Sequence, residues 1–190
     1  MELFCEVNNL MGTPEQIFLL VASKSIDFQH FRLNTLITMA ETLSLKTDEN
    51  TITLSKKLLN IAMKNRLEVQ QLIKIAATWR KLGDDKAVID FVNHVQNEYI
   101  PFAHNAHLLD EMGRAFINLA KKSKTIFNES HTRQIKNTLK KDFENYILEA
   151  KKTLNQAIEN AENEVQKDYI SKALNGIDTK LLPLQQRKMK

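Results

Sequence analysis

Turn-forming residues and cysteine are scarce in this sequence of 190 residues. It contains four glycines and three prolines, whereas a fold with many strands needs Gly, Pro and Asp at its turns. The shortage therefore favours helices. The single cysteine, Cys5, excludes an intrachain disulfide and gives no sign of an oxidising compartment.

Long apolar runs are also missing. No stretch approaches the roughly 18 uncharged apolar residues that a membrane-spanning helix needs. The first residues carry Glu2 and Glu6, and they lack the basic region followed by an apolar run that marks a signal peptide. We therefore expect a cytoplasmic protein with no membrane span, although a protein exported by a specialised secretion machine would have the same features.

Charge is unevenly distributed along the chain. Hydrophobic residues make up 43% and charged residues 26%, which is typical of a globular protein. The net charge is +4, but residues 121–190 hold 15 Lys and Arg against nine Asp and Glu. The basic character therefore belongs to the last third of the chain.

Several short motifs predict where helices begin. Thr13-Pro14-Glu15-Gln16 has a capping residue, a proline at the first helical position and Gln three residues after the cap. This motif predicts a helix that ends near Ser23. Ser25 or Asp27 can cap a second helix that reaches Leu43, and Asp48 can cap a third that ends at about Lys64.

The clearest signal is a predicted helical hairpin over residues 69–99. Apolar residues recur at helical spacing on both sides of Gly83-Asp84. Gly83 stands where a left-handed residue would close the first helix, and Asp84 can cap the second. The second helix should end before Pro101, because proline disfavours helical geometry in the residue before it. Another helix is predicted over about 103–122.

The final segment differs from the rest. From about Ser130 to Gly176 the chain has no Gly or Pro, and apolar residues recur at helical spacing. The pattern predicts either one helix of forty-odd residues or two helices with a break near Asn160–Asn163. Either would pack lengthwise on the other helices or pair with another chain.

Three of the predicted helices share a pattern of large, small and large residues on one face. A small residue between two large ones lets a neighbouring helix approach closely. The first residues of the patterns are 36 and 37 positions apart, which fits a repeated helix–turn–helix unit. The patterns are Leu36, Ala40, Leu43; Leu72, Ala76, Trp79; and Leu109, Gly113, Phe116.

With these residues the chain resembles the tetratricopeptide-repeat family over about residues 30–125. The resemblance is most specific in the central unit, where it also includes the Gly-Asp turn, two positions of the second helix and the following proline. It implies stacked helical hairpins that bind a partner in a concave groove. The residues that carry it are Leu72, Ala76, Trp79, Lys81-Leu82-Gly83-Asp84, Ala87, Phe91 and Pro101.

The sequence also departs from that family's pattern. The turn lies one residue too close to Ala87, and His94 stands where a small residue is usual. The units around Leu36 and Leu109 lack the Gly-Asp turn. A helical bundle without repeats is therefore the alternative fold.

No motif for catalysis or cofactor binding is present. His104, His107 and Glu111 have the spacing of one helical face, but a metal site needs ligands from a second element. We interpret these three residues as part of a solvated face. Cys5 lies in a stretch with no catalytic signature, and the isolated glycines exclude a phosphate-binding loop. We therefore predict no metal, no cofactor and no enzymatic activity.

The basic last third raises the alternative of nucleic-acid binding. Lys121-Lys122-Ser123-Lys124, Lys140-Lys141 and Lys151-Lys152 could contact a polyanion by charge alone. Glutamates interleave with these lysines, and no stacking aromatic residues alternate with them. We interpret the pattern as a solvated helix face and consider a nucleic-acid partner unlikely.

Taken together, these features predict an all-α protein of stacked antiparallel helical hairpins with a long C-terminal helix. The predicted parts are a hairpin domain over 1–128, a helical segment over 129–180 that packs on it, and a basic tail over 181–190. The sequence indicates no specific activity.

The predicted function is that of a non-enzymatic adaptor or regulator that binds a protein or peptide in a concave helical surface. The alternatives are a bundle that dimerises through the C-terminal helix and a nucleic-acid binder. The predicted partner-binding residues lie off the apolar stripes or near hairpin ends, and they are Gln71, Lys74, Arg80, Asn93, His107 and Arg114.

Overall fold

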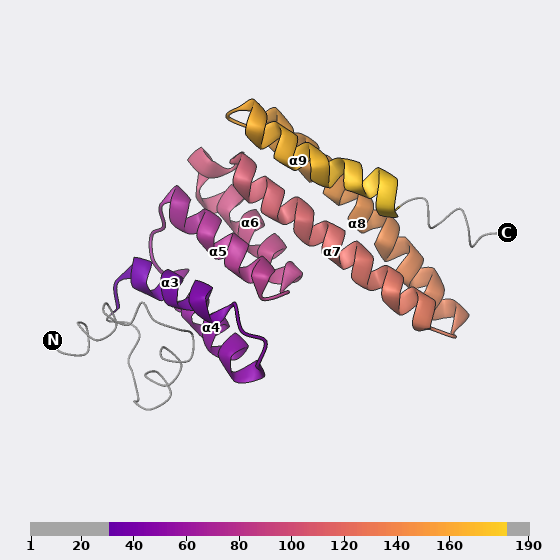
Figure 1. Ribbon diagram of the computed structural model, residues 1–190, viewed down its shortest axis with the longest axis horizontal. Coiled ribbons are helices and arrows are strands. Elements are labelled where there is room, and N and C mark those ends of the chain that lie inside the picture. The colour runs from indigo at the N-terminus through magenta and orange to yellow at the C-terminus, as the bar shows by residue number, and fades with distance from the viewer. Residues whose placement is uncertain (1–30, 182–190) are drawn as a thin grey trace. The chain divides into compact units, whose positions relative to one another are not determined.

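The computed structural model describes residues 31–181, and this part of the chain is all-helical, as predicted (Figure 1). Its contacts divide the chain into two compact units, Met1–Gly83 and Asp84–Lys190. The helix predicted over residues 14–23, the caps at Ser25 and Asp27, and the tail after Leu181 lie outside the described residues. In that described part, no helix is long and apolar enough to cross a membrane.

The described part of the first unit contains three helices: α3 (Leu33–Leu43), α4 (Glu49–Ala62) and α5 (Val69–Lys81). Helix α3 packs against both α4 and α5. The predicted cap at Asp48 is confirmed, because its carboxylate accepts a hydrogen bond from the Thr51 backbone N–H at 2.9 Å. Hydrogen bonds from the Thr51 side chain and backbone lower the pKa of Asp48 from its usual value.

Apolar residues fill the space between these three helices. Each large side chain that is fully buried contributes about 1.5–3 kcal/mol relative to an exposed one. The core consists of Leu36, Ile37, Met39, Ala40, Leu43, Leu58, Leu59, Ala62, Leu67, Leu72, Ile75, Ala76 and Trp79.

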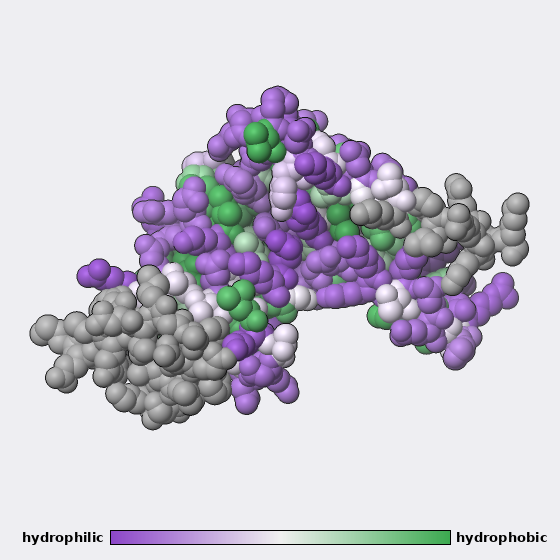
Figure 2. Space-filling model, viewed as in Figure 1, coloured by the Kyte–Doolittle hydropathy of each residue, from purple (hydrophilic) through white to green (hydrophobic). Residues whose placement is uncertain are grey.

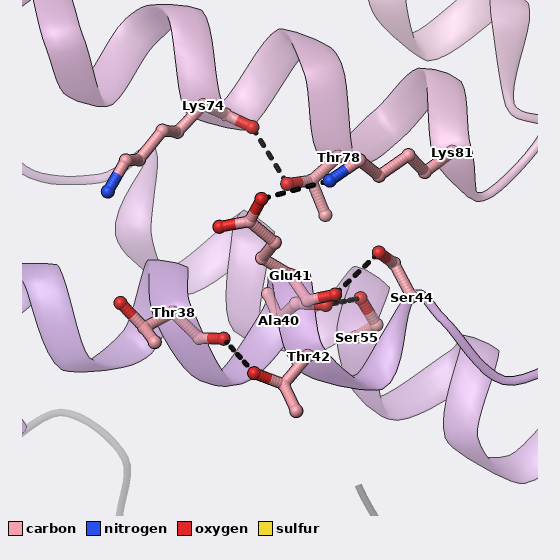
Figure 3. A network of polar contacts seen from close by, with 9 residues as sticks. All are labelled: Thr38, Ala40, Glu41, Thr42, Ser44, Ser55, Lys74, Thr78 and Lys81. Carbon is pink, nitrogen blue, oxygen red and sulfur yellow. Dashed lines mark hydrogen bonds and ion pairs between the residues drawn. The ribbon is translucent and has the colours of Figure 1, made fainter. Parts of the chain in front are cut away.

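Figure 3 shows two of the polar contacts that join α3 to its neighbours. The Ser55 hydroxyl of α4 donates to the Ala40 carbonyl at 2.7 Å inside the core, so a buried polar group is satisfied. On the surface, Lys81 of α5 forms an ion pair with Glu41 at 2.9 Å. Both partners are more than a third exposed, so this pair contributes little to stability.

The turn after α5 has the predicted chemistry. Gly83 has a positive φ of 71°, a conformation that residues with a Cβ rarely adopt. Asp84 follows as the cap of α6 and accepts a hydrogen bond from the Ala87 backbone N–H at 3.3 Å. The boundary between the two units falls between these two residues.

The second unit begins with α6 (Asp85–Glu98) and a 3-10 turn, η2 (Ile100–Phe102), and continues with α7 (Ala106–Glu129). Helix α6 ends before Pro101, as predicted. Helix α7 extends seven residues beyond the predicted end at about 122, because Ala120 and Ser123 stay buried where the sequence becomes rich in lysine.

The final segment forms two helices, α8 (Arg133–Glu159) and α9 (Glu164–Gly176), followed by a π-helical turn, η3 (Ile177–Leu181). The alternative with a break near Asn160–Asn163 is therefore correct. Asn163 caps α9 by accepting from the Gln166 backbone N–H at 2.9 Å.

Helices α7 and α8 form a long antiparallel hairpin, with α6 against α7 and α9 against α8 (Figure 1). The end of this hairpin extends past α9. Gly113 lets the two long helices come close, since a Cβ there would lie 2.6 Å from Cδ2 of Leu154. This is the close approach that the large–small–large pattern predicts.

A candidate partner-binding cleft on the second unit

A cleft of about 340 Å³ opens between α6, α7 and α8. This volume is at the lower end of the range for ligand pockets. The cleft combines an apolar floor with polar walls, so it can hold an apolar side chain and satisfy polar groups beside it. Its lining residues are Asn93, Gln96, Met112, Phe116, Glu149, Lys152, Thr153 and Gln156.

Helix α6 supplies one wall through two carboxamide side chains. Asn93 and Gln96 are three residues apart and therefore share a face of the helix. The Gln96 Nε2 donates to the Ala103 carbonyl at 3.2 Å, which fixes the orientation of this side chain. Oε1 can accept a hydrogen bond at the cleft, and the second N–H of Nε2 can donate one.

Helix α7 supplies the floor. Met112 and Phe116 are one turn apart, with Met112 buried and Phe116 partly exposed. The Phe116 ring lies 6.4 Å from the ring of Tyr146 on α8, at an angle of 32°. A thioether and an aromatic ring provide a surface that accepts apolar groups of different shapes.

Helix α8 supplies the other wall. Glu149, Thr153 and Gln156 recur at intervals of four and three residues, so they form one row along the helix. Lys152 lies next to this row. The cleft therefore has one carboxylate and one ammonium group among neutral polar groups, and its lining has no net charge.

The polar side chains of the lining can form hydrogen bonds in both directions. Among the described residues that line the cleft there is one acid and no histidine or cysteine. Carboxamides and a hydroxyl both donate and accept hydrogen bonds, as the backbone of a bound peptide also does.

The structure brings only one of the predicted partner-binding residues to the cleft. Asn93 is exposed on its wall. Gln71 has a local role instead: its Oε1 accepts from the Glu68 backbone N–H at 2.9 Å as part of a capping box, and its Nε2 donates to Asn34 at 2.7 Å. Lys74 is exposed and Arg80 is half-buried, both on α5 of the first unit.

The two remaining predicted residues lie on α7. His107 is exposed in the first turn, where its backbone N–H donates to the Asn105 side chain at 3.1 Å. Arg114 binds the buried Asp110 carboxylate, with Nε 2.9 Å from both oxygens. Its guanidinium also lies 4.4 Å from the ring centre of Tyr169 on α9. Arg114 therefore joins α7 to α9.

The two aspartates at the start of α6 have different roles. Asp84 is the cap, and Asp85 is the first residue of the helix. Asp85 is 2% exposed. Its carboxylate accepts from Lys122 Nζ at 2.6 Å and from the Asn118 side chain at 3.0 Å.

The histidines near the start of α7 do not form a metal site. His104 and His107 are exposed and Glu111 is half-buried. Over residues 31–181, no three His, Cys, Asp or Glu side chains come together in a group that could hold a metal ion. Cys5 lies outside the described residues.

Compared with known protein families, curated proteins and solved structures, the chain shows no match to any of them.

Most of the cleft residues were not predicted as site residues. The sequence places Phe116 in a large–small–large pattern of helix packing, and it predicts that Lys152 and the glutamates around it form a solvated face. The signal in the sequence was the row Glu149, Thr153, Gln156, which runs beside the apolar stripe of α8 rather than opposite to it. Polar residues in such a position border a core, and they line a groove when the neighbouring helix does not cover them.

Proposed function

We propose that this protein is a non-enzymatic binding module that holds a segment of a partner protein in the cleft between α6, α7 and α8. The observation that carries the proposal is the lining of the cleft, where carboxamides and a hydroxyl surround Met112 and Phe116. Such a site can receive an apolar side chain on its floor and bind the adjoining polar groups at its walls.

The spacing of the helices supports stacked hairpins as part of this proposal. Helices α3, α5 and α7 begin at residues 33, 69 and 106, which are 36 and 37 positions apart. A repeat of that length is typical of helical solenoids, which bind partners on extended surfaces. The small residues of the three patterns, Ala40, Ala76 and Gly113, are all buried, which suits close helix packing.

The charges that line the cleft indicate which partner segments it selects. Glu149 and Lys152 leave the cleft lining with no net charge, so the cleft gives no general attraction to strongly acidic or strongly basic segments. We therefore expect a charged partner group to be selected by its position against one of these two side chains, and the rest of the segment to be recognised by shape and hydrogen bonds.

A peptide-display selection against the full chain tests this function. Random peptides are selected for binding, and the dissociation constants of the selected peptides are measured by fluorescence anisotropy. Asn93→Ala together with Gln156→Ala should weaken binding by about tenfold, because loss of a hydrogen bond to a bound peptide costs on the order of 1 kcal/mol per group.

Asn97→Ala is the matched control, since Asn97 is exposed on the same helix as Asn93 and does not line the cleft. It should leave the dissociation constant unchanged. A selection that yields no binding peptide, or peptides equally affected by both sets of substitutions, contradicts the proposed function.

A further inference from the structure

Two rows of residues on α7 and α8 follow the alternating spacing of four and three residues that is characteristic of coiled coils. Together we call them the crease rows. The row on α7 is Met112, Phe116, Leu119, Ser123 and Ile126. The row on α8 is Ile135, Leu139, Asp142, Tyr146, Glu149, Thr153 and Gln156.

The crease rows face the same side of the α7–α8 hairpin as the cleft. Five of their members line it directly, two on α7 and three on α8. Ile135 lies 18 residues before Thr153, which is five turns of helix and therefore the same face. Ile126 lies 14 residues after Met112, or two heptads. The cleft therefore lies at one end of the crease rows, and the rows themselves continue to the end of the hairpin.

Several side chains of the crease rows are more exposed to solvent than the side chains that hold the hairpin together. A separate row on α8, Phe143, Ile147, Ala150, Leu154 and Ala157, has the same spacing and is fully buried. In the crease rows, Met112, Ser123 and Thr153 are buried as well, whereas Phe116, Leu119, Leu139 and Tyr146 are half-buried. Ile126 is 50% exposed and Ile135 is 48% exposed.

These two isoleucines lie at the ends of the crease rows that are farthest from the cleft. Much of the surface in view in Figure 2 is hydrophilic, and hydrophobic residues appear there as separate areas. Isolated exposed apolar residues are usual on proteins. Ile126 and Ile135 differ from such isolated residues, because each belongs to a heptad row whose other end lines the cleft.

We propose that the crease rows bind an amphipathic α-helix of a partner protein, which lies along α7 and α8 and completes a three-helix coiled coil. The inference rests on the proposed function and specifies its partner. A helix places side chains every three and four residues, so one apolar stripe reaches both the cleft and the isoleucines. A cleft of about 340 Å³ admits side chains rather than a whole helix.

The charges within the crease define the partner further. Asp142 and Glu149 are half-buried and lie one heptad apart. Within residues 31–181, neither carboxylate forms an ion pair. A partner helix with two Lys or Arg residues seven positions apart, beside its apolar stripe, would place a cation against each of them.

Two lysines near the end of the hairpin, Lys124 and Lys140, lie away from the crease rows. Lys124 of α7 donates to the Leu181 carbonyl of η3 at 3.2 Å. Lys140 lies eleven residues, or about three turns, before Lys151, which pairs with Asp178 of η3 at 2.6 Å. Both lysines therefore belong to the side of the hairpin that η3 occupies.

Designed peptides of 21 residues test the inference with the full chain. The first peptide carries leucines at heptad spacing and two lysines seven positions apart, the second has glutamates in place of those lysines, and the third has a central proline that breaks the helix. Fluorescence anisotropy gives the dissociation constants. The lysine peptide should bind at least about tenfold more tightly than either of the others.

Variants of the chain locate the binding site. Ile135→Glu should weaken binding of the lysine peptide by about tenfold or more, because it places a charge in the apolar contact. Leu148→Glu is the matched control: Leu148 is 64% exposed on the same helix but lies on the opposite face, and its substitution should have no effect. Circular dichroism shows that both variants fold.

A charge exchange tests the role of the carboxylates. Asp142→Lys together with Glu149→Lys should reverse the preference, so that the glutamate peptide binds more tightly than the lysine peptide. Glu144→Lys, on an exposed position of α8 outside the crease rows, should leave the preference unchanged.

Four results would overturn the inference. Binding that Ile135→Glu does not weaken would exclude the crease rows. Library peptides that bind without helix formation, and that depend on Asn93 but not on Ile135, would preserve the proposed function and exclude a helical partner. Self-association of the chain that Ile135→Glu abolishes, measured by sedimentation, would assign the crease to a second copy. If no peptide of either kind binds, the proposed function fails as well.

Discussion

Asp85 is a carboxylate at the first position of α6, and it is almost fully buried at 2% exposure. Burial of an ionised group is costly unless a cation and hydrogen bonds compensate for it. Lys122 and Asn118, both on α7, provide that compensation. These contacts fix the start of α6 at one position along α7. They therefore also position the α6 residues that line the cleft.

We expect Lys122→Ala to lower the free energy of unfolding by about 1–3 kcal/mol, because Asp85 would stay buried without its cation. Lys121→Ala is the matched control, since Lys121 is exposed on the same helix. It should change stability by less than about 0.5 kcal/mol. Urea unfolding followed by circular dichroism measures both values, and equal effects would show that the ion pair does not hold α6.

At this scale the sequence predicts local chemistry well and distant partners poorly. Gly83 and Asp84 were predicted correctly because a left-handed closing residue and a cap depend on the chain within a few residues. The ion pair of Asp85 was missed because Lys122 lies 37 positions away. No pattern near Asp85 distinguishes it from the neighbouring cap.

At the scale of the elements, Gly113, the small residue of a large–small–large pattern, allows a close contact between α7 and α8. Glycine within a helix costs about 1 kcal/mol relative to alanine. Here its absent side chain leaves space for Leu154, which is fully buried on α8. The close approach of α7 and α8 aligns the two crease rows.

Gly113→Ala should therefore destabilise the protein by about 1 kcal/mol, since the clash with Leu154 outweighs the gain in helix propensity. Gly176→Ala is the control, because no atom lies within 4 Å of the position its Cβ would take. It should be neutral or stabilising. In a Leu154→Ala background, Gly113→Ala should become stabilising, as measured in a double-mutant cycle of thermal or urea unfolding. An unchanged sign there would mean that Leu154 is not the cause.

The predicted ends of the long helices differ in how well the sequence defined them. The break between α8 and α9 follows from a local cap at Asn163, and the sequence offered it as one of two alternatives. The end of α7 was placed about seven residues too early, because Lys121-Lys122-Ser123-Lys124 looks like a solvated terminus. Packing of Ser123 against the rest of the unit, which local sequence does not show, continues the helix to Glu129.

At the scale of the whole molecule, the sequence predicted an all-helical chain, and that is confirmed for residues 31–181. Which helices share a core is a different question. The signal for a hairpin at Gly83-Asp84 is strong, yet the two compact units divide at this turn. A turn motif describes the backbone at one place, whereas a unit is defined by contacts between residues far apart in the sequence.

The two units each have an apolar core, and this predicts that they unfold separately. Trp79, the single tryptophan, is 5% exposed in the first unit, so its fluorescence reports on that unit, whereas circular dichroism reports on all the helices. Leu58→Ala removes a fully buried side chain of the first unit and should shift the fluorescence midpoint in urea. Leu154→Ala does the same in the second unit and should shift only the circular dichroism transition. If Leu154→Ala instead shifts the fluorescence midpoint as well, the units unfold as one, and the stability of α7 and α8 then depends on the first unit.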